Sequence, residues 1–133
     1  MTDLPAGALI AVVDDDPGVL KSLEYLLESA GHAVLAFGSA AALLDGGVLV
    51  KIDCVISDVH MPVMNGFALS QAIRQIRPEL PVILITGHPG MLERPPTPDA
   101  GRRRVFTKPF NGQELLMAVS DALENMRTST RQS

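Results

Sequence analysis

The stretch Ala8-Leu-Ile-Ala-Val-Val-Asp-Asp-Asp-Pro17 joins a continuous apolar run to three consecutive acidic residues. An apolar run without alternation is typical of a parallel strand that is covered on both faces of its sheet. Asp16 followed by Pro17 predicts a helix N-cap and a first helical position. The stretch therefore predicts a buried strand that leads directly into a helix, with Asp14 and Asp15 at the end of the strand.

The remaining sequence repeats this alternation between short apolar runs and segments with a helical spacing of apolar residues. Further strands are predicted at 33–37, 54–57, 81–85 and 104–107. Helices are predicted after Asp16, after Ser39, over Gly66 to Arg77 with Ile76 facing inward, and after Asn111, which begins a pattern similar to a capping box. Because strands that alternate with helices are joined by crossovers, the chain is expected to form an α/β fold with a doubly wound, five-stranded parallel sheet.

One segment interrupts the pattern where a helix is expected, between Thr86 and Arg104. It contains Pro95, Pro96 and Pro98, which cannot all lie inside a helix because each removes a hydrogen-bond donor and clashes with the preceding turn. The sequence thus predicts a proline-disrupted fourth helix.

The composition indicates one globular domain and narrows the class of protein. The chain has 133 residues, of which 47% are hydrophobic and 20% charged, and its net charge of -4 disfavours nucleic-acid binding by this domain. The single cysteine, Cys54, and the absence of a signal-peptide pattern favour a cytoplasmic protein that does not bind membranes. We expect a core over about 8–126 and a polar tail, or the start of a linker, over 127–133.

Polar residues follow the predicted strands at the positions where an open parallel sheet binds its ligands, beyond the carboxyl ends. These residues are Asp14 and Asp15, Asp58, Thr86 and Lys108. Three neighbouring carboxylates repel one another unless some are protonated or a cation joins them, and Mg²⁺ is the hard cation that suits oxygen ligands. A carboxylate beside Mg²⁺ can attack a phosphoryl group, while Lys108 and the Thr86 hydroxyl help to position and neutralise it.

Four motifs at these positions resemble the signatures of receiver domains of bacterial two-component response regulators. They are Val12-Val-Asp-Asp-Asp-Pro17, Ser57-Asp-Val-His-Met-Pro-Val-Met-Asn-Gly66, Ile85-Thr-Gly87 and Thr107-Lys-Pro-Phe110. They occur in order, and the resemblance covers about residues 8 to 126. It implies a flavodoxin-like receiver fold with strand order 2-1-3-4-5.

The resemblance also implies a role for each site residue. Asp58 would be the phosphoacceptor, and Mg²⁺ would be bound by Asp15, Asp58 and the backbone carbonyl of His60, with Asp14 completing the acidic pair. Thr86 would be the hydroxyl that moves toward the phosphoryl group, and Lys108 would pair with a phosphoryl oxygen. Such a domain catalyses only its own phosphorylation and dephosphorylation, so it is not classed as an enzyme.

The implied partners follow from the same resemblance. The donor would be a sensor histidine kinase or a histidine phosphotransfer protein, and the output would pass to a partner protein or an effector domain. The domain itself would be a monomer or a weak homodimer.

Two features depart from the family pattern. Receivers usually carry an aromatic residue three positions before the lysine, where this chain has Val105; Phe106 is offset by one position and should point to the opposite face of its strand. Together with the proline-rich segment, this predicts that the phosphorylated state is communicated by a different route than in most receivers. His60 and His88 are expected to be exposed loop residues. The family resemblance offers a second interpretation, because in receivers these positions line the entrance of the pocket and tune the lifetime of the phosphoryl group.

Two alternatives remain open from the sequence. A pseudo-receiver would bind partners without being phosphorylated. The two departures from the family pattern, on the face that most receivers use for signalling, favour this alternative, and the intact acidic site disfavours it. A phosphatase of the haloacid-dehalogenase type would use Asp14 as its nucleophile, since Asp14-Asp-Asp16 loosely matches the Asp-x-Asp motif. Phosphoryl labelling distinguishes the two aspartates, Asp14 and Asp58.

Overall fold

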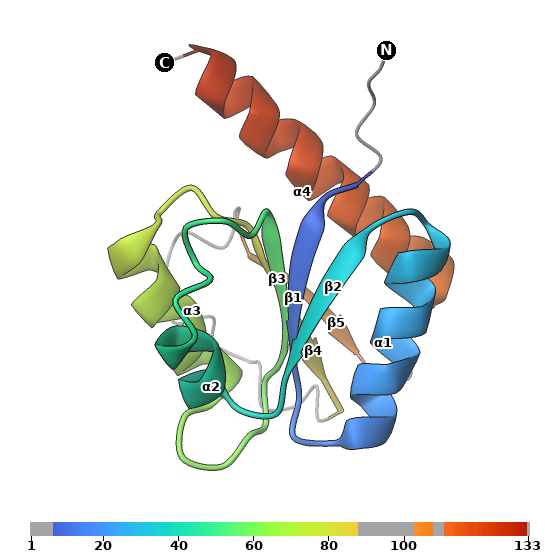
Figure 1. The fold of residues 1–133 in the computed structure, drawn as a ribbon, viewed down its shortest axis with the longest axis vertical. Helices are drawn as coiled ribbons and strands as arrows, with labels where there is room; N and C mark the ends of the chain where they lie inside the picture. The colour runs from blue at the N-terminus through green and yellow to red at the C-terminus, as the bar shows by residue number, and fades with distance from the viewer. Residues whose placement is uncertain (1–6, 88–102, 108–110, 133) are drawn as a thin grey trace.

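The chain forms a five-stranded sheet with helices on both faces (Figure 1). The computed structural model describes residues 7–87, 103–107 and 111–132. The elements in chain order are β1 (Leu9–Val13), α1 (Pro17–Ser29), β2 (Ala33–Phe37), α2 (Ala40–Asp45), β3 (Cys54–Asp58), α3 (Gly66–Ile76), β4 (Val82–Thr86), β5 (Arg103–Thr107) and α4 (Gly112–Gln132).

All strand pairs are parallel, and their order is β2-β1-β3-β4-β5, as the family resemblance implied. Alternate residues of the strands enter two separate apolar clusters because successive side chains point to opposite faces. One cluster, with Val13, Val55 and Leu84, lies under α2 and α3. The other, with Val12 and Ile56, lies under α1 and α4. Strands β3 and β4 are buried along their whole length, which explains their unbroken apolar sequence.

The predicted helix starts are confirmed by their caps. The side chains of Asp16 and Ser39 accept hydrogen bonds from the first turns of α1 and α2, and Asn111 Oδ1 accepts one from Glu114 N at 3.1 Å. Gly31, with φ 94°, ends α1 in the left-handed conformation that glycine tolerates.

Arg77 fixes the chain at the end of α3. Its Nη1 donates to the carbonyls of Leu49 at 2.7 Å and Ile52 at 2.8 Å, and its Nε bonds the carboxylate of Glu79 at 3.0 Å. The guanidinium therefore ties the segment before β3 to the helix that follows β3.

Two sequence predictions differ from the structure. Ile76 is 55% exposed rather than inward, because it is the last residue of α3 and the chain turns away at Arg77. The last helix continues to Gln132 rather than ending near Met126, since no glycine or proline interrupts residues 127–132. Figure 1 shows this end of α4 extending past the sheet.

The unusual fifth strand agrees with the sequence. Phe106 packs into the cluster under α1 and α4, whereas Val105 is 44% exposed on the other side. The proline-rich segment, where the disrupted fourth helix is predicted, lies outside the described residues. No helix in the described part of the chain is long and apolar enough to cross a bilayer.

Candidate functional site

Four of the five predicted polar residues, Asp14, Asp15, Asp58 and Thr86, lie at the carboxyl edge of the sheet. Val13 of β1 is the register partner of Ser57 in β3, so the acidic pair that follows β1 lies beside Asp58 at the end of β3. Asp58 in turn pairs with Ile85, which places Thr86 of β4 at the same edge. Neighbouring parallel strands thus bring together residues that are far apart in the sequence.

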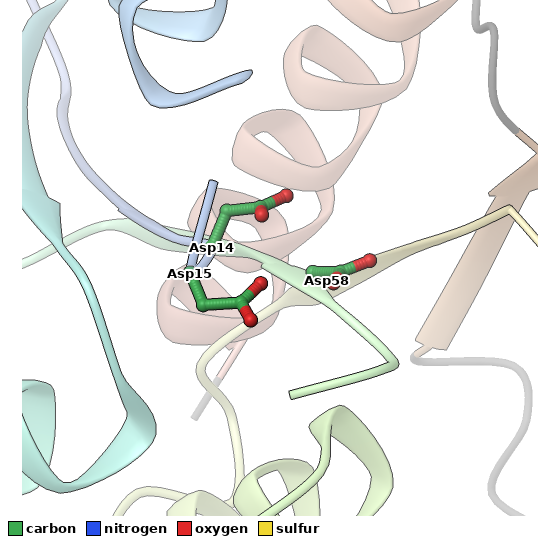
Figure 2. Close-up of side chains that lie close together, drawn as sticks. All are labelled: Asp14, Asp15 and Asp58. Atoms are coloured by element: carbon green, nitrogen blue, oxygen red, sulfur yellow. The ribbon is translucent and has the colours of Figure 1, made fainter. Parts of the chain in front are cut away.

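Asp14, Asp15 and Asp58 form a compact acidic cluster, which Figure 2 shows at the ends of their strands. One carboxylate oxygen from each lies within 4.8 Å of the others. Asp14 and Asp58 are buried, while Asp15 is exposed. Octahedral Mg²⁺ holds its oxygen ligands about 3–4 Å apart. Three carboxylate oxygens gathered in one cluster are the ligand type that Mg²⁺ prefers, so the donor set fits the ion.

Asp14 is held in place by the backbone on both sides. Its N–H donates to the Phe37 carbonyl of β2 at 3.1 Å. Its Oδ1 accepts from Asp16 N at 2.9 Å, and Asp16 in turn caps α1. The acidic pair is therefore positioned by the strand-to-helix turn that the sequence predicted.

The backbone around Asp58 is fixed from three directions. Val59 N donates to Ile85 O at 2.9 Å, and the buried Ser57 hydroxyl donates to Asp58 O at 2.9 Å. Gly66 N, at the start of α3, donates to Val59 O at 2.9 Å. A Cβ on Gly66 would lie only 2.5 Å from Asp58 O, so this position requires glycine. Gly66 belongs to one of the four sequence motifs, but nothing in the sequence alone indicates this close approach.

The loop between β3 and α3 contains a tight turn. Met64 N donates to Pro62 O at 2.8 Å across Val63, which is fully exposed and has φ 71°. This backbone conformation is strained for a β-branched residue. Asn65 then caps α3 through a bond to Ala68 N at 2.9 Å, a cap that the sequence analysis missed.

His60 contacts Thr86 directly, which the sequence analysis did not anticipate. The His60 Nε2 and Thr86 Oγ1 atoms are 3.0 Å apart. Thr86 is fully buried, and His60 is half-buried rather than an exposed loop residue. The expectation of exposure was wrong because the contact joins residues 26 positions apart: Thr86 ends β4, and His60 follows the paired strand β3 by two residues.

The other residues that the sequence pointed to are Cys54, Lys108 and His88. Cys54 is buried as expected, and burial, aided by the Asp53 carboxylate, raises the pKa of its thiol to about 12, so it stays protonated. Lys108 and His88 lie outside the described residues, so their predicted places at the site stay predictions.

Comparison with known proteins identifies the family. The sequence profile of the response regulator receiver domain matches residues 10–120, so the chain belongs to that family. The fold and acidic edge described above are those of a domain that accepts a phosphoryl group in two-component signalling. Receiver domains bind Mg²⁺ at an acidic cluster of this kind, interact with histidine kinases and output domains, and are generally not enzymes.

Individual relatives support this membership. The response regulator protein TmoT of Ectopseudomonas mendocina is 36% identical over 117 residues, covering 88% of this chain and 53% of that protein. The transcriptional regulatory protein GlrR of Escherichia coli is 37% identical over 130 residues, covering 98% of this chain and 29% of GlrR. The chain thus spans about half or less of these relatives. The signal receiver domain of an HD domain-containing protein from Pseudomonas fluorescens superposes with a TM-score of 0.87 at 28% identity, covering 100% of this chain and 98% of that one.

Proposed function

We propose that Asp58 is the phosphoacceptor of this receiver domain and that Mg²⁺ binds beside it. The supporting observation is the meeting of three carboxylate oxygens within 4.8 Å at the end of β1 and β3. Asp15, Asp58 and the His60 carbonyl would bind the ion directly, with Asp14 as the second acid. When bound, Mg²⁺ neutralises negative charge on the carboxylates and on the incoming phosphoryl oxygens.

The chain's own residues position the reaction. A carboxylate oxygen of Asp58 attacks the phosphorus of a phosphohistidine; a P–O bond forms, the P–N bond breaks, and the released imidazole nitrogen takes up a proton. The carboxylate needs no general base because it is already a nucleophile. Lys108 would pair with a phosphoryl oxygen, and the Thr86 hydroxyl would move to bind another.

The donor, on this proposal, is a sensor histidine kinase or a histidine phosphotransfer protein. Relatives that are about two to three times as long suggest that the output passes to an effector domain or a partner protein. Residues 1–133 would act as a single receiver domain in the cytoplasm, as a monomer or weak homodimer. Neither the pseudo-receiver nor the phosphatase alternative gains support from the family comparison.

Phosphorylation by acetyl phosphate tests the assignment. Intact-mass measurement should show one added phosphoryl group in the presence of Mg²⁺ and none after addition of a chelator. Asp58→Ala should abolish the addition, whereas Asp45→Asn, a change at the exposed end of α2, should leave it unchanged. Labelling of Asp58→Ala to the wild-type level would refute the proposal. A phosphoryl group mapped to Asp14 would favour the phosphatase alternative.

A further inference from the structure

The contact between His60 and Thr86 lies where β3 and β4 end: Thr86 is the last residue of β4, and His60 follows β3 by two residues. The bond from Val59 N to Ile85 O ties the end of β3 to the end of β4 immediately before both side chains. This anchoring sets His60 Nε2 at 3.0 Å from Thr86 Oγ1. The imidazole therefore reaches the hydroxyl without any distortion of the sheet.

The Thr86 oxygen has to move when its hydroxyl turns toward another partner. Threonine is β-branched, so its hydroxyl changes direction only by a jump between staggered rotamers. Thr86 is fully buried, so water does not compensate for a lost partner. A hydroxyl that turns toward a phosphoryl oxygen must leave the imidazole, whichever histidine tautomer is present.

We propose that His60 is a positioning residue that holds the Thr86 hydroxyl in its resting orientation and so opposes the switched state. The inference rests on the proposed phosphorylation of Asp58, and it concerns the state of the switch rather than the transfer itself. His60 has two separable roles on this view. Its backbone carbonyl would belong to the metal site and is present in every variant, whereas its side chain contacts the Thr86 hydroxyl.

The expected size of the effect follows from the strength of one hydrogen bond. A bond of ordinary net strength changes an equilibrium constant about two- to tenfold. A ligand that needs the switched state binds more weakly in proportion to the rarity of that state. Removing the imidazole should therefore tighten the binding of beryllofluoride, a phosphoryl mimic, about two- to tenfold.

The experiment compares beryllofluoride binding, in saturating Mg²⁺, by wild type, His60→Leu and His60→Gln. The leucine fills a similar volume without a polar atom, and the glutamine amide can replace Nε2. We expect tighter binding by His60→Leu and a return toward the wild-type Kd in His60→Gln. The γ-methyl NMR signal of Thr86 in free His60→Leu should also lie nearer its beryllofluoride-bound position. If His60→Leu does not fold, His60→Ala carries the same expectation.

A double-mutant cycle with Thr86→Val assigns the effect to the hydroxyl. In that background His60→Leu should no longer tighten binding, because no hydroxyl remains to be held. Equal beryllofluoride affinity of wild type and His60→Leu, or tightening that persists with Thr86→Val, would overturn the inference. Failure of the proposed function looks different: wild type itself would then bind no beryllofluoride, or Asp58→Ala would bind it equally well.

Discussion

Replacing Gly66 by alanine should displace the backbone that carries Asp58 and so disturb the acidic site. The new Cβ would lie 2.5 Å from Asp58 O and 2.9 Å from Val59 Cα, whereas real Cβ contacts essentially never fall under 3.0 Å. The oxygen must therefore retreat by at least 3.0 minus 2.5, or 0.5 Å. Both contacts are to backbone, so no side-chain rotation relieves them. The start of α3 or the Asp58 peptide has to move.

The cost can be bounded. Overpacking of this kind costs about 1–3 kcal/mol, and the better helix propensity of alanine returns up to about 1 kcal/mol. With a central overpacking cost of about 2 kcal/mol, we expect the free energy of unfolding to fall by about 1–2 kcal/mol. Because a misplacement of about 1 Å can lower a rate about a hundredfold, half of that displacement should slow phosphorylation by acetyl phosphate about tenfold.

Urea unfolding followed by circular dichroism measures the first effect, and the rate of phosphoryl incorporation measures the second. Gly38→Ala is the matched control, because a Cβ at Gly38 would meet no described atom within 4 Å. It should change neither quantity appreciably. If Gly66→Ala matches the wild type in both stability and phosphorylation rate, the close approach of α3 to Asp58 is not a constraint on the site.

Three further predictions concern the metal, a histidine and an arginine. Mg²⁺ at ten times its Kd should stabilise the fold by about 1.4 kcal/mol and raise Tm by about 5 °C, a shift that Asp15→Ala should remove; no shift in wild type would contradict a preformed site. Burial lowers the pKa of His32 from 6.5 despite the opposing Asp53 carboxylate, and its buried Nδ1 has no hydrogen-bond partner among the described residues. As the pH falls, the unfolded chain takes up the proton before the folded chain does, so the free energy of unfolding should be level above pH 6.5 and fall below it. In His32→Gln, the free energy of unfolding measured in urea should fall less between about pH 7.5 and about pH 5.5. An equal fall in wild type and variant would exclude His32 as the cause. Arg77→Met removes the donor of two backbone carbonyl bonds and should cost about 1–3 kcal/mol. Glu79→Gln, which removes the charge from the ion pair and keeps both carbonyl bonds, should cost less than about 1 kcal/mol. Similar urea midpoints for the two variants would argue against the importance of the carbonyl bonds of Arg77.

The sequence predicted what depends on local pattern. Apolar runs located the strands, and residue types with known capping preference located the starts of α1 and α2 at Asp16 and Ser39. The same reasoning missed features that depend on distant contacts. Gly66 is required by the carbonyl of Asp58, which α3 meets only after the loop folds back. His60 reaches Thr86 only because β3 and β4 pair in one register.

Local pattern also fails at the ends of elements. Ile76 has the spacing of an inward residue, yet it is exposed because α3 ends there. The polar residues after Met126 gave no apolar periodicity, although nothing in them prevents a helix from continuing to Gln132. Periodicity reports which side of a helix packs, but how far the neighbouring sheet extends decides which turns are covered.

The contacts at the acidic edge separate residues that stay fixed from one that can move. Asp14 and Asp58 are held through backbone bonds to β2 and β4, so moving them would disrupt the sheet. Thr86 is held by a side-chain contact with His60, which breaks without any change in the strands. Val105 of β5 is 44% exposed. Fully burying a valine side chain stabilises a protein by about 1.5 kcal/mol. Burying the remaining part would then yield less than about 1 kcal/mol. The free energy that distinguishes the two states should therefore come mainly from the partners of the Thr86 hydroxyl, with little from position 105.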